Sequence, residues 1–241
     1  MSYFLFNGIS SRDLGLIITE PVVRPSWSQM TEEATSLSAT SKIIQQFKTY
    51  DNAEFTISTV ITDTATSNIH SIYQALNGFG VLQLSANPEE YMNVKINPLL
   101  PEAVALAMAK LIITVQAFPF AYAVEPTSVD LTAATSYTEA NNRGTVFSEP
   151  EFRFTPTAAQ SFLLNVNGGV FRVDVPATLV NKEIIVDCAA QVTYYLDDNN
   201  NKVSINYLTY NNYPLLHTGM NYCKHDGGIS ALTVNVRERW L

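Results

Sequence analysis

Residues 111–126 read LIITVQAFPFAYAVEP, and this stretch decides how the chain is divided. In its first part, LIITV, alternate apolar side chains fall on one face, as they do in a β-strand. Pro119 has no N–H to donate and restricts the residue before it to extended geometry, so we expect the strand to end here. A second proline, Pro126, follows, and then a segment rich in Thr, Ser and Ala. The stretch therefore predicts a joint between two β-rich halves, residues 1–126 and residues 127–241.

Length and composition are compatible with one large β domain or two smaller ones. The 241 residues are ample to bury a core. Hydrophobic residues make up 46% of the chain and charged residues only 15%. A surface rich in Thr, Ser and Asn but poor in charge favours a protein that covers part of itself with partners.

The charge distribution argues against nucleic acid as a direct ligand. The net charge of −8 is spread over both halves: residues 1–126 hold 6 basic and 11 acidic side chains (6 − 11 = −5), and residues 127–241 hold 8 and 11 (8 − 11 = −3). The chain has no run of basic residues that could follow a phosphate backbone.

Neither terminus nor interior suggests export or membrane insertion. The first residues, MSYFLFNGISSRD, lack the basic segment and the long apolar run of a signal peptide. The longest uninterrupted apolar stretch, residues 103–109, is far short of a membrane span. Two cysteines, Cys188 and Cys223, do not form a disulfide framework, and both lie on apolar-patterned segments. We expect buried free thiols in a soluble protein made in the cytoplasm, without membrane association.

The first half predicts several strands and one helix. Strands are expected at residues 3–7, 14–19, 53–62, 79–85 and 91–96. Residues 66–77 carry apolar side chains at helical spacing (Ile69, Ile72, Tyr73, Leu76), which predicts an amphipathic helix. Thr66 or Ser67 is expected to cap its start, and Gly78 suits the left-handed position after its end.

Two segments of the first half are harder to interpret. Residues 22–42 lose all periodicity and carry a lone Trp27, so they are either an assembly arm or an ordinary mobile loop. Residues 98–110 contain PEAVALAMAK, which has helical propensity but also alternates like a strand. For residues 101–110 we favour a strand that runs directly into residues 111–115, because the alternation continues unbroken.

The second half predicts a β-sandwich. Short strands are expected at residues 151–154, 161–166, 170–175, 183–188, 191–196, 203–207, 220–225 and 229–236. The turn Asn167-Gly168-Gly169 is a strong hairpin signal, because Asn and Gly adopt positive φ at little cost. Many short strands separated by turn residues within about a hundred positions are typical of a sandwich.

No segment of the sequence predicts a catalytic or metal site. Residues 197–201, DDNNN, begin like an EF-hand loop, but Lys202 and Leu208 stand where glycine and a bidentate glutamate are needed, so a solvated hairpin turn is expected. Cys223 and His225 share one strand face, with His217 nearby, yet a zinc site needs four ligands at workable spacing. No nucleophile elbow, phosphate loop or dinucleotide fingerprint occurs. We expect no enzyme, no cofactor and no metal.

Taken together, several segments resemble the distal tail proteins (Dit) of long-tailed phages, a siphophage tail-component family. The segments are FLFNGISSRDLGLIITEPVVRP, IYQALNGFGVLQLSANPEEYMNVKI, AFPFAY at residues 117–122, NNRGTVFSEPEFRF, IIVDCAAQVTYY and YPLLHTGMNYC. In the last of them, Thr218 stands where the family commonly has proline. Each segment alone is a weak signal, but they occur in the family's order along nearly the whole chain.

The resemblance implies a mainly β fold with two domains: a ring-forming amino-terminal β domain with one helix, and a carboxy-terminal galectin-like β-sandwich. It implies a homo-hexameric ring in the virion that joins the tail tube protein to the tail-associated hub protein, without catalytic residues. The junction between the domains would be formed by Phe118, Pro119, Phe120 and Tyr122. The resemblance also allows residues 234–241 to return to the first domain.

Assembly contacts and two alternatives complete the expectations. For ring contacts we name the first strand and the 22–42 arm, with Tyr3, Phe4, Phe6 and Trp27 as candidates. One alternative is a carbohydrate-binding sandwich, which is doubtful because the only tryptophans are Trp27 and Trp240 and the chain is too short for an inserted sugar-binding module. The other is a different tail tube or baseplate component.

Overall fold

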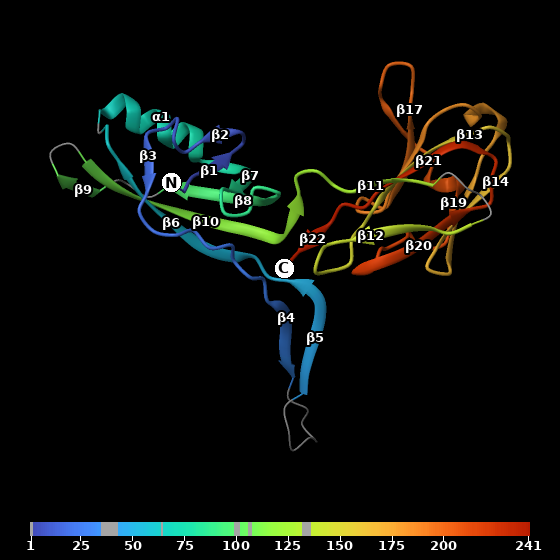
Figure 1. The fold of residues 1–241 in the computed structure, drawn as a ribbon, viewed down its shortest axis with the longest axis horizontal. Helices are drawn as coiled ribbons and strands as arrows, with labels where there is room; N and C mark the ends of the chain where they lie inside the picture. The colour runs from blue at the N-terminus through green and yellow to red at the C-terminus, as the bar shows by residue number, and fades with distance from the viewer. Residues whose placement is uncertain (1, 35–42, 64, 99–101, 106–107, 132–135) are drawn as a thin grey trace. The chain divides into compact units, whose positions relative to one another are not determined.

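The computed structural model describes residues 2–34, 43–63, 65–98, 102–105, 108–131 and 136–241 (Figure 1). Its described part is mainly β, as expected, with a single α-helix. Two compact units are present: residues 1–124 together with Leu241, and residues 125–240.

The first unit is built on an antiparallel sheet with the strand order β2-β1-β7-β8-β10-β6-β3, and β9 pairs with β10 as well. Its strands are β1 (Phe4–Phe6), β2 (Ile9–Ser10), β3 (Leu16–Ile18), β6 (Ala53–Ile61), β7 (Gly78–Leu84), β8 (Glu90–Pro98), β9 (Glu102–Ala105) and β10 (Met108–Ala123). One face of the sheet carries the buried apolar residues, such as Ile57, Leu82, Val94 and Val115. This alternation along each strand is the pattern that the sequence predicted.

Strand β10 does not end at the proline, contrary to our prediction. It runs through Pro119, because residues 118–120 belong to neither neighbouring ladder. Pairing with β6 stops at Ala117, and pairing with β8 resumes only at Ala121. In this bulge the missing N–H of proline therefore interrupts neither the ladder with β6 nor the ladder with β8.

Residues 102–105 are a strand, as favoured, but they do not run straight on into β10. Strand β9 pairs antiparallel with the start of β10, with Glu102 opposite Lys110. The chain therefore runs in opposite directions in β9 and β10, a relation that unbroken alternation cannot reveal.

Helix α1 (Thr66–Leu76) confirms the helical periodicity. Ile72 and Leu76 are fully buried, and Gly78 has φ +106° beyond the helix end, as expected. The predicted cap is wrong: the N-cap position is Ala65, whose N–H donates to Asp63 Oδ1.

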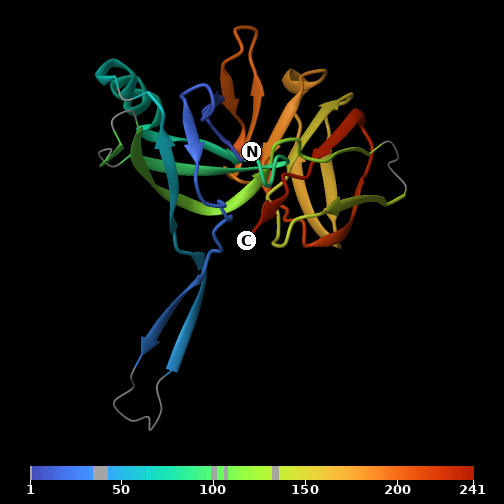
Figure 2. The same ribbon diagram turned by 60° about the vertical axis from the view of Figure 1, so that its left-hand side comes forward.

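Strands β4 (Gln29–Ala34) and β5 (Ile43–Tyr50) form a two-stranded antiparallel sheet of their own. The prediction of an irregular segment over 22–42 is therefore wrong in part, since β4 lies inside it; residues 35–42 lie outside the described residues. In both views this hairpin extends away from the sheet of the first unit (Figure 1, Figure 2).

The second unit is a sandwich of two antiparallel sheets, as predicted. The six-stranded sheet has the order β11-β21-β13-β16-β17-β18, and the five-stranded sheet has the order β12-β20-β14-β15-β19. The bounds of these strands are β11 (Ser128–Asp130), β12 (Thr138–Asn142), β13 (Glu151–Pro156), β14 (Ser161–Val166), β15 (Gly169–Asp174), β16 (Ile184–Asp187), β17 (Val192–Leu196), β18 (Lys202–Ser204), β19 (Thr209–Tyr210), β20 (Gly219–His225) and β21 (Ile229–Asn235). The last strand of the chain, β22 (Arg239–Trp240), belongs to neither of these two sheets. Strands β11 and β12 lie in the segment that the sequence presented as a Thr/Ser/Ala-rich joint. The strand expected at 203–207 is shorter, because the 3-10 helix η2 (Asn206–Leu208) follows β18; the other 3-10 helix is η1 (Ala177–Leu179).

The core of the sandwich lies between the inner faces of its two sheets. Phe154 of β13 stacks on Phe162 of β14, with ring centroids 4.2 Å apart. The Asn167-Gly168 turn joins β14 to β15 with φ +51° and +87°, which confirms the predicted hairpin.

Candidate functional site

The residues named for assembly have different surroundings. Phe4, Phe6 and Trp27 are buried within the chain, and Trp27 Nε1 donates to the carbonyl of Ala117 at 3.4 Å. Tyr3 is half-buried, with the guanidinium of Arg12 over its ring. The three buried side chains support the first unit from within, and a direct assembly contact by any of the four residues stays a prediction.

The residues named for the junction form three aromatic pairs with three different strands. Phe118 stacks on Phe79 of β7, Phe120 packs edge-on against Tyr50 of β5, and Tyr122 stacks on Tyr91 of β8. The ring centroids are 6.0, 5.2 and 5.6 Å apart, respectively. The bulge makes these three contacts possible, because it bends β10 and directs its aromatic side chains toward different strands.

Phe120 adopts an unusual backbone conformation within this bulge. Its φ is +77°, a region in which a bulky L-residue is strained. Such strain persists only where the surroundings impose it. Here the contact with Tyr50 places the ring of Phe120 at the base of the β4–β5 hairpin, so the bulge helps to hold the hairpin's root.

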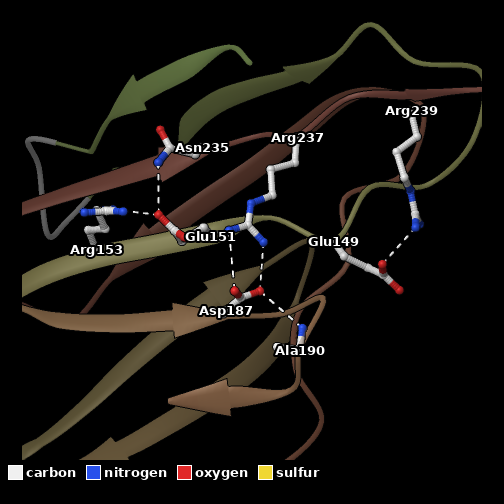
Figure 3. Close-up of polar contacts among 8 residues, drawn as sticks. All are labelled: Glu149, Glu151, Arg153, Asp187, Ala190, Asn235, Arg237 and Arg239. Atoms are coloured by element: carbon white, nitrogen blue, oxygen red, sulfur yellow. Dashed lines mark hydrogen bonds and ion pairs between the residues drawn. The ribbon is translucent and has the colours of Figure 1, made fainter. Parts of the chain in front are cut away.

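A charged cluster on the six-stranded sheet was not predicted from the sequence (Figure 3). Glu151 and Asp187 are directly opposite each other on β13 and β16. Two carboxylates in that position repel each other. Arg237, which follows β21 with φ +54°, lies between them: it donates to Asp187 Oδ1 at 2.8 Å and to Glu151 Oε2 at 2.5 Å. Glu151 also accepts from Arg153 Nε at 2.6 Å.

These contacts lower the pKa of Asp187. Burial by itself raises the pKa of Asp187, but the hydrogen bonds from Arg237 and from the backbone N–H of Ala190 outweigh it and hold that pKa below its ordinary value. Asp187 therefore remains ionised at neutral pH. Through Arg237, the cluster ties the segment after β21 to strands β13 and β16.

Glu238, which follows Arg237 in the chain, contacts a different set of residues, Thr127 and Arg143. Its carboxylate is buried and accepts the Thr127 N–H at 3.1 Å, the Thr127 hydroxyl and Arg143 Nε at 3.0 Å. Burial acts to raise the pKa of Glu238, yet the hydrogen bonds from Thr127 and Arg143 hold it below the ordinary value. These hydrogen bonds connect Thr127, near the start of the second unit, to Glu238, near its end.

Arg239 is the third residue of the segment 237–239 whose side chain binds the second unit. It donates to the carbonyl of Phe147 at 2.8 Å and to Glu149 Oε2 at 2.8 Å (Figure 3). Its own carbonyl accepts the N–H of Thr145, and at Gly144 a Cβ would lie 2.2 Å from that oxygen. Only glycine fits this approach. The alternating Arg-Glu-Arg run was the one sequence signal that could have suggested the cluster.

The residues considered for chemistry are in structural surroundings. Cys188 and Cys223 are buried free thiols, as predicted, and burial raises the pKa of Cys223 to about 12 and that of Cys188 further. His225 Nδ1 accepts the N–H of Gly227. Asp197 accepts the N–H groups of Asn199 and Asn201, as in the expected turn. Among the described residues, no group of three acidic, His or Cys side chains could hold a metal ion, and no described helix is long and apolar enough to cross a membrane.

No family model and no curated protein matches this sequence. Among solved structures, the two-unit β fold is that of a phage distal tail protein. One matching structure is that of SPP1 Dit (gp 19.1), described as a paradigm of the hub adsorption apparatus in phages that infect Gram-positive bacteria. The comparison has a TM-score of 0.80 at 14% sequence identity and covers 100% of both chains. The Dit-like fold that the sequence predicted is thus confirmed.

Proposed function

We propose that this protein is a structural component of a phage tail tip, in which six copies form a ring that joins the tail tube to the tail-associated hub protein. The observation that supports this most strongly is the match to SPP1 Dit over the full length of both chains. Fold alone does not define function. However, the sequence resemblance and the full-length fold match are separate observations that favour the same role. In this role the protein acts without catalysis, in the virion, after synthesis in the host cytoplasm.

In this proposal the first unit builds the ring. A closed ring needs a heterologous interface, so each copy must present two different surfaces. The β4–β5 hairpin supplies one of them: a two-stranded ribbon is only marginally stable alone, and its free edges can pair with strands of a neighbouring copy. Its root is held by Trp27 and by the Tyr50–Phe120 contact, so the arm leaves the unit from a fixed base.

The sandwich forms the galectin-like peripheral domain in this proposal. The residues around Arg237, Glu238 and Arg239 hold the last segment of the chain on the sandwich. Leu241, by contrast, belongs to the first unit, where its carbonyl accepts Arg24 Nη2 at 2.8 Å. In this proposal the chain thus returns to the ring domain at its last residue, as the resemblance allowed for residues 234–241.

The decisive experiment is negative-stain imaging of the concentrated protein, together with mass photometry. We expect rings with a central hole. A chain that stays single at every concentration, and also in the presence of tail tube protein, would contradict the ring.

The arm is tested by replacing residues 32–45 with Asn-Gly, which shortens the hairpin but keeps Trp27 and Tyr50 in place. We expect loss of the ring with little change in melting temperature. As a control, Gly-Gly in place of Asn199-Asn200, in the exposed β17–β18 turn, should leave the ring intact. A full ring from the shortened chain would refute the role of the arm.

A further inference from the structure

The two outward faces of the sandwich differ in chemistry. Both faces of such a sandwich are ordinarily polar. On the six-stranded sheet, the outward positions include the charged residues Glu151, Arg153 and Asp187, and Leu196 is the one exposed large apolar side chain on its described strands. The five-stranded sheet and its edge instead expose six such side chains: Tyr137, Leu163, Val170, Tyr210, Met220 and Tyr222.

The strand register places these six residues on one continuous face. Arg172 is opposite both Leu163 and Tyr210, and Asn165 is opposite both Val170 and Lys224. Tyr222 and Met220 are opposite Glu139 and Asn141 on the edge strand β12. Tyr222, Met220 and Tyr137 are each between 47% and 49% exposed. A contiguous face of Tyr, Met and aliphatic side chains is typical of a binding surface.

The chemistry of this face favours a protein over a polysaccharide. Sugars stack on open aromatic rings, but the guanidinium of Arg172 covers Tyr210 at 4.8 Å and Lys224 Nζ covers Tyr137 at 4.8 Å. Leu163, Val170 and Met220 add aliphatic surface that sugars do not need.

The charges of the face are nearly balanced. Arg172 is neutralised by two hydrogen bonds of 2.7 Å to Asp174. Within the described part of the chain, Lys224 and Glu139 form no ion pair, and they lie on the neighbouring strands β20 and β12. Among the described residues, a cation and an anion without an ion-pair partner thus lie on the same face, which makes that face complementary in charge to a second copy of itself.

We propose that this face binds the same face of a second copy of the chain about a two-fold axis, with Lys224 of each copy against Glu139 of the other. Stacked sheets are separated by about 10 Å when apolar side chains fill the space between them. The contact is isologous, so it joins copies in pairs and cannot close a ring. It is therefore a separate interface from the ring contact proposed above.

The test is mass photometry and sedimentation of the full-length protein over a range of concentrations. Pairing doubles the mass of a single chain; a ring carries the face six times, so pairing joins whole rings and at least doubles the mass. Y222E should return the mass to that of the unpaired assembly, and L196E, the matched change on the other sheet, should leave the wild-type mass unchanged. K224E and E139K should each weaken the pair, and the double variant K224E/E139K should restore it, since the charges are only exchanged.

Three results would overturn the proposal. These are a wild-type mass that never doubles, a mass that Y222E leaves unchanged, and a double charge exchange that fails to recover what the single changes lose. Binding of neutral glycans on an array that is abolished by Y222E, without any doubling of mass, would assign the face to a sugar instead.

Discussion

The segment that closes the second unit gives the sharpest stability prediction, the substitution E238Q. Glutamine keeps the shape of the buried side chain but removes its charge. The carboxylate now accepts from the Thr127 N–H at 3.1 Å and from Arg143 at 3.0 Å. An amide in its place presents an NH₂ group to one of these donors, which leaves that donor without an acceptor.

The expected loss is about 2 kcal/mol, within the range for a charge-assisted hydrogen bond in a buried position. Arg143 is itself 57% exposed, so its share of the loss is small. For a unit of this size, about 2 kcal/mol corresponds to a fall in melting temperature of about 6–10 °C. E183Q is the matched control: Glu183 is 51% exposed and 3.8 Å from Arg153, so the change should cost less than about 0.5 kcal/mol.

The pH dependence provides a second readout. The pKa of Glu238 is lowered in the folded chain, so its contribution is fully present above the unfolded pKa and is lost as pH falls through the folded pKa. On acidification the free energy of unfolding of wild type should therefore fall by more than that of E238Q. The difference in stability between the two proteins should become smaller. Calorimetry at neutral and acidic pH measures both effects. Equal melting temperatures of E238Q and E183Q at neutral pH would refute the reasoning.

Three further predictions concern the bulge, the end of the chain and the thiols. F120G should be more stable than F120A by about 1 kcal/mol in urea unfolding, because glycine accepts φ +77° without strain; the reverse order would show that no strain is stored there. R24A removes the partner of Glu90 and should lower stability by about 1–2 kcal/mol by the same method, and an unchanged midpoint would contradict a stabilising role of this partly buried pair. Cys188 and Cys223 should resist iodoacetamide at pH 8 and both react after denaturation, as mass spectrometry can determine; labelling of the native protein would refute their burial.

Elements whose signal is local were predicted well. The helix at 66–76 follows from the spacing of Ile72 and Leu76 with their neighbours, and most strands of the sandwich follow from alternation between turn residues. The Asn167-Gly168 hairpin follows from two residues that tolerate positive φ.

Elements that depend on their neighbours were predicted poorly. Whether a strand can pass Pro119 depends on whether an adjacent strand needs its N–H, and here neither β6 nor β8 does. Strand β4 has no alternating apolar pattern, because it pairs with β5 alone. The charged cluster joins Glu151 and Asp187 to Arg237 across 86 and 50 residues of sequence, so no local pattern could reveal it.

The sequence by itself determined that this chain is a two-part β protein with one helix, because periodicity and turn chemistry are written in adjacent residues. The resemblance to distal tail proteins came instead from the order of whole segments along the chain. The stretch at residues 111–126 shows what remained open. The sequence located a boundary there, but only the tertiary structure decided that the strand continues through the proline as a bulge and that its aromatic rings reach three other strands. The physical reason is that a backbone group requires a partner only where another strand presents one, and the strands that do so come from distant parts of the chain.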